Sequence, residues 1–88
     1  MNTEATMEKV TSTLDMLGPG GVAVIKKVSM RGPIRRRLMD MGLVNGTEVE
    51  IIRYAPLGDP IEIKVKNYFL SVRKEDAEHI EVEIKKNA

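Results

Sequence analysis

Residues 60–66, PIEIKVK, alternate apolar and charged side chains after the initial proline. Successive side chains of a β-strand point to opposite faces, so the aliphatic residues of this segment share one face and the charged residues share the other. Only the apolar face can pack against a core, which is typical of antiparallel strands with one solvated side. The segment therefore predicts a sheet that covers a core on one side.

Four further short segments are rich in β-branched or alternating apolar residues and are bounded by turn residues. These features are typical of strands joined by short loops. The expected strands are residues 21–28, 48–54, 69–73 and 80–84, and the expected turns are residues 18–21 (GPGG), 45–46 (NG), 56–60 (PLGDP) and 67–68 (NY).

One helix is expected, from about Pro33 to Met41. Proline suits the first helical position, where its missing N–H is not needed. Ile34, Leu38 and Met41 follow at helical spacing and form one apolar stripe. Gly42 then supplies a residue that can end the helix with a positive φ.

Short strands without crossover helices favour an antiparallel meander that closes on itself, because closure removes exposed sheet edges. The predicted fold class is mainly β, a small SH3-like antiparallel barrel with one short α-helix. The alternative is an open sheet with the helix packed across it. We expect residues 13–85 to form this single domain, residues 1–12 to be a flexible tail and residues 86–88 to be a frayed C-terminus.

The amino-acid composition excludes several classes of function. The 88 residues carry 14 Lys and Arg against 13 Asp and Glu, so the net charge of +1 gives no overall attraction to nucleic acid or anionic lipid. The lack of cysteine removes disulfides and thiolate chemistry, and His79 is the sole histidine, so no catalytic residues and no enzyme are expected. No apolar run approaches the roughly 20 residues that span a bilayer, so we expect a soluble intracellular protein.

Residues 75–83 combine several carboxylates with the one imidazole. Glu75 and His79 could share one face of a short helical turn and are the candidate metal ligands, whereas Glu81 and Glu83 would project from the outer surface of a strand. A solvated acidic surface accounts for the same residues. We expect no resident cofactor, and a weak divalent-metal site in the Glu75–Glu83 run is the alternative.

Two other features indicate an interaction surface: the loop of residues 56–60, and the predicted helix, where Met39 points off the apolar stripe. The tip of the loop is formed by Leu57, Gly58, Asp59 and Pro60, and Leu57 is exposed there between two prolines. A loop shaped only to turn the chain is the alternative interpretation. Arg35, Arg36 and Arg37 are consecutive in the predicted helix and point about 100° apart, so they cannot all meet one strip of phosphates, and no nucleic acid is expected as a partner.

The segment from Arg36 to Leu43 (RRLMDMGL), then Gly46-Thr47 and residues 55–61 (APLGDPI), closely resembles the FeoA family. Residues 17–20 (LGPG) and 70–77 (LSVRKEDA) resemble the same family, so the likeness extends from near Leu14 to Ile84. Asn45 stands where that family often has proline, which leaves the turn less rigid.

The resemblance implies a small non-enzymatic cytosolic protein with an SH3-like barrel that accompanies the ferrous iron transporter FeoB and modulates it. It also implies recruitment to the inner face of the membrane, although the chain itself does not span one. On this basis Leu57 to Pro60, together with Arg35, Arg36 and Met39 of the helix, are expected to contact the transporter. The alternative function is a soluble metal-responsive regulatory module that uses the acidic run.

Overall fold

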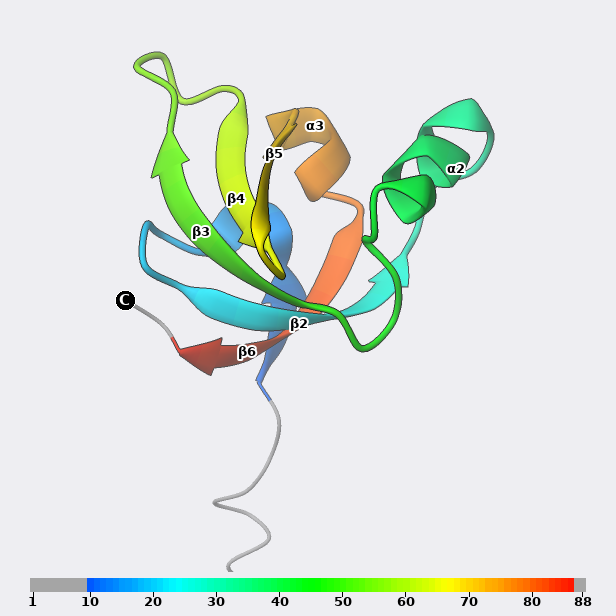
Figure 1. Ribbon diagram of the computed structural model, residues 1–88, viewed down its shortest axis with the longest axis horizontal. Coiled ribbons are helices and arrows are strands. Elements are labelled where there is room, and N and C mark those ends of the chain that lie inside the picture. Colours follow the sequence, from blue (N-terminus) through cyan, green and yellow to red (C-terminus); the bar gives the residue numbers. More distant parts are fainter. Residues whose placement is uncertain (1–9, 87–88) are drawn as a thin grey trace, which may run out of the picture.

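In the computed structural model, residues 10–86 are described. Their secondary structure is mainly β, as predicted (Figure 1). In chain order the elements are β1 (Thr11–Thr13), the 3-10 turn η1 (Leu14–Met16), β2 (Val22–Val28), α2 (Pro33–Asp40), β3 (Glu48–Tyr54), β4 (Ile61–Val65), β5 (Tyr68–Val72), α3 (Lys74–Ala77) and β6 (Ile80–Lys86).

Six strands of the described chain form one antiparallel sheet in the order β1-β6-β2-β3-β4-β5. The register shifts between Ile25 and Lys27 and between Ile51 and Arg53. Such bulges bend a strand and increase its twist. The sheet therefore curls around its own apolar face, with β1 and β5 at its edges and no pairing between them among the described strands. Helix α2 lies beside the sheet and does not pack across it, unlike in the open-sheet alternative (Figure 1).

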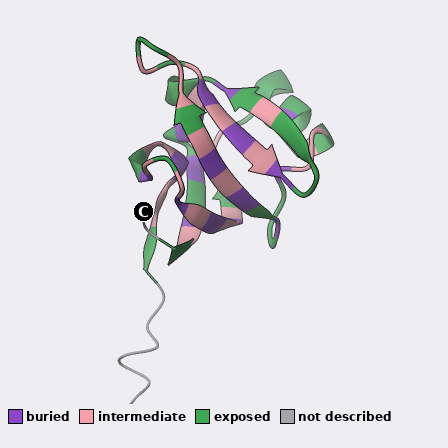
Figure 2. Cartoon of the chain, turned by 60° about the vertical axis from the view of Figure 1, so that its left-hand side comes forward, coloured by how far each residue is buried: buried purple, intermediate pink, exposed green. Residues whose placement is uncertain are grey.

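The core forms where the alternating strands bring their apolar faces together, and Figure 2 shows buried residues alternating with half-buried or exposed ones along the strands. Ile61, Ile63 and Val65 of β4 are fully buried, which confirms the predicted inward face of this strand. The buried hydrophobic residues are Leu14, Leu17, Ala23, Ile25, Val28, Leu38, Leu43, Val49, Ile51, Ile61, Ile63, Val65, Val72, Ala77, Ile80 and Val82.

The predicted helix is confirmed to within one residue, but its apolar stripe is only partly buried. Leu38 lies in the core, Met41 follows the helix and is half-buried, and Ile34 is 47% exposed. Ile34 sits in the first turn of a helix that projects beyond the sheet, so the core cannot cover it (Figure 1). The predicted apolar stripe therefore faces the core at Leu38 and leaves it at Ile34.

The ends of the domain also differ from expectation. Thr11 and Ser12, predicted in the flexible tail, form β1 with Thr13 and pair with β6. Lys86, expected to fray, belongs to β6, and Tyr68, expected in a turn, begins β5. The rest of the predicted tail, residues 1–9, and residues 87–88 lie outside the described residues.

Candidate docking face

Strand register brings three segments to one end of the sheet. Tyr54 at the end of β3 pairs with Ile61 at the start of β4, and Ile61 pairs with Val72 at the end of β5. The loop of residues 55–60 and helix α3 therefore leave the sheet side by side. Val28 at the end of β2 pairs with Ile80, which follows α3, so the segment leading into α2 starts beside the other end of α3.

The loop of residues 55–60 is a closed turn with Leu57 at its tip. Ala55 N–H donates to the Pro60 carbonyl at 3.0 Å, and Gly58 N–H donates to the Ala55 carbonyl at 2.7 Å. Leu57 is 96% exposed, which confirms the predicted exposure. A large aliphatic side chain held in water by a hydrogen-bonded turn is a candidate apolar contact for a partner.

Asp59 faces the protein as well as the solvent. Its Oδ1 accepts a hydrogen bond of 3.0 Å from the backbone N–H of Lys74, the first residue of α3. The first N–H groups of a helix have no partner within the helix, so the carboxylate satisfies one of them. Asp59 thus joins the loop to α3.

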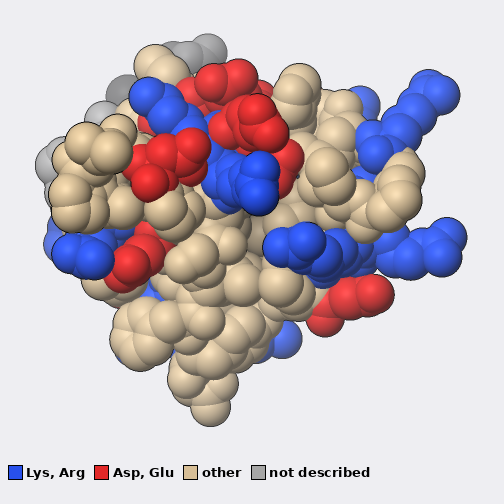
Figure 3. Space-filling view, turned by 90° about the horizontal axis from the view of Figure 1, so that it is seen from above, with Lys and Arg blue, Asp and Glu red and all other residues tan. Residues whose placement is uncertain are grey.

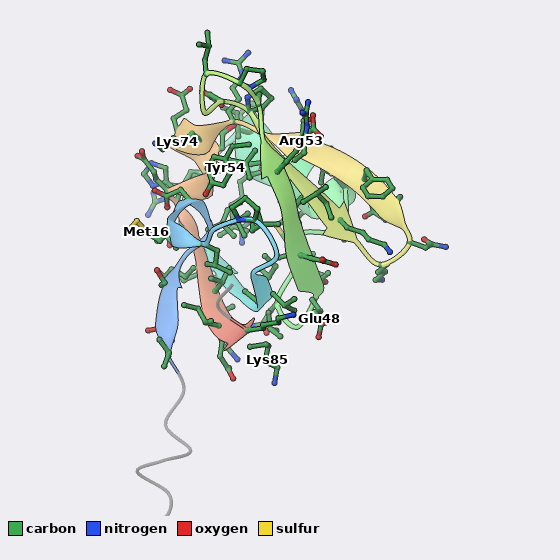
Figure 4. The ribbon with its side chains drawn as sticks, turned by 90° about the vertical axis from the view of Figure 1, so that its left-hand side faces the viewer. Met16, Glu48, Arg53, Tyr54, Lys74 and Lys85 are labelled. Atoms are coloured by element: carbon green, nitrogen blue, oxygen red, sulfur yellow. The ribbon has the colours of Figure 1, made fainter. Side chains whose placement is uncertain are left out.

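Two side chains of β3 support the base of the loop. Arg53 donates to both carboxylate oxygens of Glu62 on β4, at 3.0 and 3.4 Å, and this hydrogen bond raises the pKa of Arg53. The Tyr54 hydroxyl lies 2.5 Å from the Leu17 carbonyl and 3.0 Å from the Asp15 carbonyl, so it can donate to either and holds η1 against β3 (Figure 4). The pKa of Tyr54 is raised above its usual value, mainly by burial and to a smaller extent by the negative charge of Asp15.

A groove of about 250 Å³ separates α2 from α3 and β5. Ile34 and Leu38 of α2, with Met41 directly after the helix, supply its apolar side. An adjoining hollow of about 290 Å³ shares Ile34 with the groove and extends it to His79. The remaining lining residues of the two are Met30, Arg31, Arg37, Ser71, Val72, Arg73, Glu75 and Asp76.

We call the loop of residues 56–60, α3 and α2 the docking face. The predicted contact residues lie on it, but the structure does not bring them into one cluster. Asp59 contacts α3 directly, while α2 meets α3 from the other side across the groove. Arg35 and Arg36 are exposed and line a hollow outside that groove, and Met39 is half-buried. A partner would have to span α3 to touch both sets.

The acidic run divides between two places. Glu75 and His79 line the same hollow, as a shared face predicts. Glu81 accepts a hydrogen bond of 2.9 Å from Ser29 Oγ, and Glu83 pairs with Lys26 Nζ at 3.7 Å, both on the strand surface. Within residues 10–86, no group of three His, Cys, Asp or Glu side chains is placed to hold a metal ion.

Phe69 is an exposed apolar side chain that the sequence reasoning missed. It lies on the edge strand β5 and is 68% exposed, next to Tyr68 at 38%. The signal was present in the alternation, because Val72 is buried and Phe69 has the opposite phase. No inward face was assigned to the expected strand of residues 69–73, so this signal was not used.

Fold and surface together define a small, mainly antiparallel β-domain with exposed loop and helix side chains around one end. In residues 10–86, no helix has the length and apolar character needed to cross a membrane. The family model of the FeoA domain matches residues 12–84. The chain belongs to the FeoA family.

Relatives extend this finding. The chain is 42% identical over 71 residues to a "Fe(2+) transport protein A/Fe(2+) transporter FeoB fusion protein" of Porphyromonas gingivalis, a match that covers 81% of this chain and 8% of that protein. The chain therefore spans a small part of the length of this relative.

Two solved structures are similar. The solution structure of the FeoA protein from Chlorobium tepidum has 42% sequence identity and a TM-score of 0.80, covering 84% of this chain and 70% of that one. The zinc complex of Stenotrophomonas maltophilia FeoA, described as a procaryotic SH3 domain protein, has 30% identity and a TM-score of 0.70, covering 80% and 87%. These likenesses confirm the predicted SH3-like fold.

Proposed function

We propose that this chain is a non-enzymatic accessory module of ferrous iron uptake that docks onto a FeoB-type Fe²⁺ transporter from the cytoplasmic side and modulates it. The observation that carries the proposal is the Porphyromonas gingivalis relative, in which a similar segment and the transporter are one polypeptide. Fusion of two proteins into one chain gives them a high effective concentration for each other. Separate proteins that perform the same task must achieve this by binding.

Leu57 is the proposed apolar contact. It is almost fully exposed, so a partner could bury its whole side chain, and burial of a leucine contributes about 2 kcal/mol. Its turn is closed by two backbone hydrogen bonds, so little further ordering of the loop is needed on binding. Arg35, Arg36 and Met39 of α2 lie on the other side of α3 and would contact a partner large enough to span it.

The test is the affinity of the purified chain for the transporter of the same organism in neutral detergent. Leu57→Asp should weaken binding about 30-fold, the equivalent of about 2 kcal/mol, and leave the unfolding temperature unchanged. Met16→Asp is the matched control, because Met16 is a 69% exposed apolar residue on η1, away from the loop (Figure 4). Equal affinity of Leu57→Asp and the wild type would remove Leu57 from the interface.

A transporter that binds neither the wild type nor the control would refute the proposed function itself. An amide chemical-shift titration with the transporter's cytoplasmic GTPase domain, with and without a GTP analogue, would locate the contact. Shifts around Leu57 and α2 are expected. Nucleotide-dependent shifts would show that the chain distinguishes the states of the GTPase.

The alternative, a metal-responsive module, rests on Glu75 and His79. A relative binds zinc, which shows that the fold is compatible with a metal ion in that protein. In the described part of this chain the two side chains have no third ligand beside them. Two protein ligands are fewer than the three or four that zinc sites use, so docking is the function that the geometry supports better.

A further inference from the structure

We propose that a basic surface around α2 binds anionic lipid headgroups, so that the docked chain contacts the membrane beside the transporter. The inference rests on the proposed function, which brings the chain to a membrane, and it assigns Arg35 and Arg36 to the lipid beside the transporter instead of to the transporter itself. We call this surface the basic face, and it consists of Lys27, Arg31, Arg35, Arg36 and Arg37.

The five cations form one continuous surface. Two adjoining hollows of about 500 and 480 Å³ contain them and share Gly32 and Arg35. All five residues are exposed. Figure 3 shows Lys and Arg side chains gathered over the side of the molecule where α2 lies, with an acidic side chain beside them, while the rest of that view mixes acidic and basic side chains.

Charge is concentrated here. Residues 27–40 contain these five cations and one anion, Asp40, for a net charge of +4, whereas the whole chain carries +1 and the remainder therefore carries −3. Among residues 10–86, the structure records no ion pair for any of the five, while Lys26 and Arg53 are paired with carboxylates. Neighbouring unpaired cations repel each other, and an anionic partner relieves that repulsion.

The shape of the face suits a broad surface. α2 projects beyond the sheet (Figure 1), and successive residues of the helix, among them Arg35 and Arg36, point about 100° apart. Arg31 and Lys27 continue the charge back along the chain toward β2. A bilayer presents headgroups over an extended surface instead of one strip of phosphates, so long, flexible basic side chains at different positions can reach it, each contributing about the same attraction.

Composition favours lipid over an acidic protein. The centre of a protein interface usually holds an aromatic or aliphatic residue that fills a pocket. The non-basic residues of the two hollows are Gly32, Pro33, Asp40, Val28, Ser29 and Met30, of which Val28 is buried and Met30 half-buried. The exposed apolar residues of the docking face, Leu57 and Ile34, lie outside these hollows. Charge alone, which is what a bilayer surface recognises, therefore dominates the basic face.

Co-sedimentation of the full chain with lipid vesicles tests the proposal. Vesicles of phosphatidylglycerol and phosphatidylcholine should bind the chain in about 0.1 M salt, and vesicles of phosphatidylcholine alone should not. Each basic residue near an anionic surface raises the affinity for the vesicles about fivefold, the equivalent of about 1 kcal/mol. The triple variant R31Q/R35Q/R36Q should therefore bind about 100-fold more weakly.

The matched control is K64Q/K85Q/K86Q, which removes three cations from β4 and β6 and gives the same net charge, −2, as the triple variant. Near wild-type vesicle binding by the control supports the basic face. No binding of the wild type to anionic vesicles, or equal losses in both variants, would overturn the proposal.

Transporter binding in neutral detergent separates this inference from the proposed function. Vesicle binding without transporter binding would refute the proposed function and support the lipid contact. If R31Q/R35Q/R36Q loses affinity for the transporter in detergent and the wild type does not bind vesicles, the basic face recognises an acidic protein surface and the lipid proposal is wrong.

Discussion

Asp59→Ala should loosen the docking face and lower stability together. The substitution removes the carboxylate oxygen that accepts the Lys74 N–H at 3.0 Å and leaves that first N–H of α3 to water. Loss of a side-chain acceptor at a helix N-terminus costs about 1 kcal/mol. For a domain of this size, that loss lowers the unfolding temperature by about 4–8 °C.

Asp59→Asn is the matched control, because its amide oxygen can still accept the hydrogen bond. It should retain most of the stability and lose only the favourable charge near the helix N-terminus, about 0.3 kcal/mol. Thermal unfolding and the amide proton shift of Lys74 measure the two effects. An unchanged unfolding temperature in Asp59→Ala, or an equal fall in Asp59→Asn, would show that the hydrogen bond does not join the loop to α3.

Two further substitutions test contacts beside this face. Tyr54→Phe removes the hydroxyl that holds η1 and should cost about 1 kcal/mol in urea unfolding. Because burial, then Asp15, raises the pKa of Tyr54, the folded state favours the neutral phenol. This contribution to the free energy of unfolding is fully present below the unfolded pKa of about 10 and is lost as pH rises through the folded pKa. Tyr54→Phe should lack this loss. Identical pH profiles of unfolding free energy in the wild type and Tyr54→Phe would contradict the argument. Gly42 has φ +99°, and a Cβ there would meet the Tyr68 hydroxyl, whereas Gly46 has φ +93° and open space where a Cβ would be. Gly42→Ala should therefore lower the unfolding temperature more than Gly46→Ala. Equal falls would mean that backbone strain alone, and not the contact with Tyr68, causes the loss of stability.

The regular parts of the fold could be predicted because their signal is local. Alternation placed Ile61, Ile63 and Val65 in the core, and Pro33 with Gly42 bounded the helix to within one residue. These features depend on the period of a single element, which a sequence displays directly. The exposure of Leu57 was predictable for the same reason, since a short loop between two strand signals leaves its tip in water.

The remaining features depend on segments distant in sequence. The Tyr54 hydroxyl bonds to carbonyls 37 and 39 positions away, and Asp59 accepts from a backbone N–H 15 positions away. No periodicity reports such pairs. Ile34 has helical spacing with Leu38, yet only the three-dimensional position of α2 shows that the core ends before it reaches Ile34.

The side chains proposed to bind a partner or lipid differ from those that stabilise this end of the molecule, with one exception. Leu57 and the basic face project into solvent, so their substitution removes few contacts from the folded state, whereas Tyr54 and the Arg53–Glu62 pair fasten the strands beneath them. Asp59 belongs to both groups, because it lies two residues from the exposed tip and also bonds to α3. A partner that pulls on the loop would therefore act on α3, and α3 borders the groove beneath α2. These contacts link the loop to the segment of the basic face on α2 through α3, a single short helix.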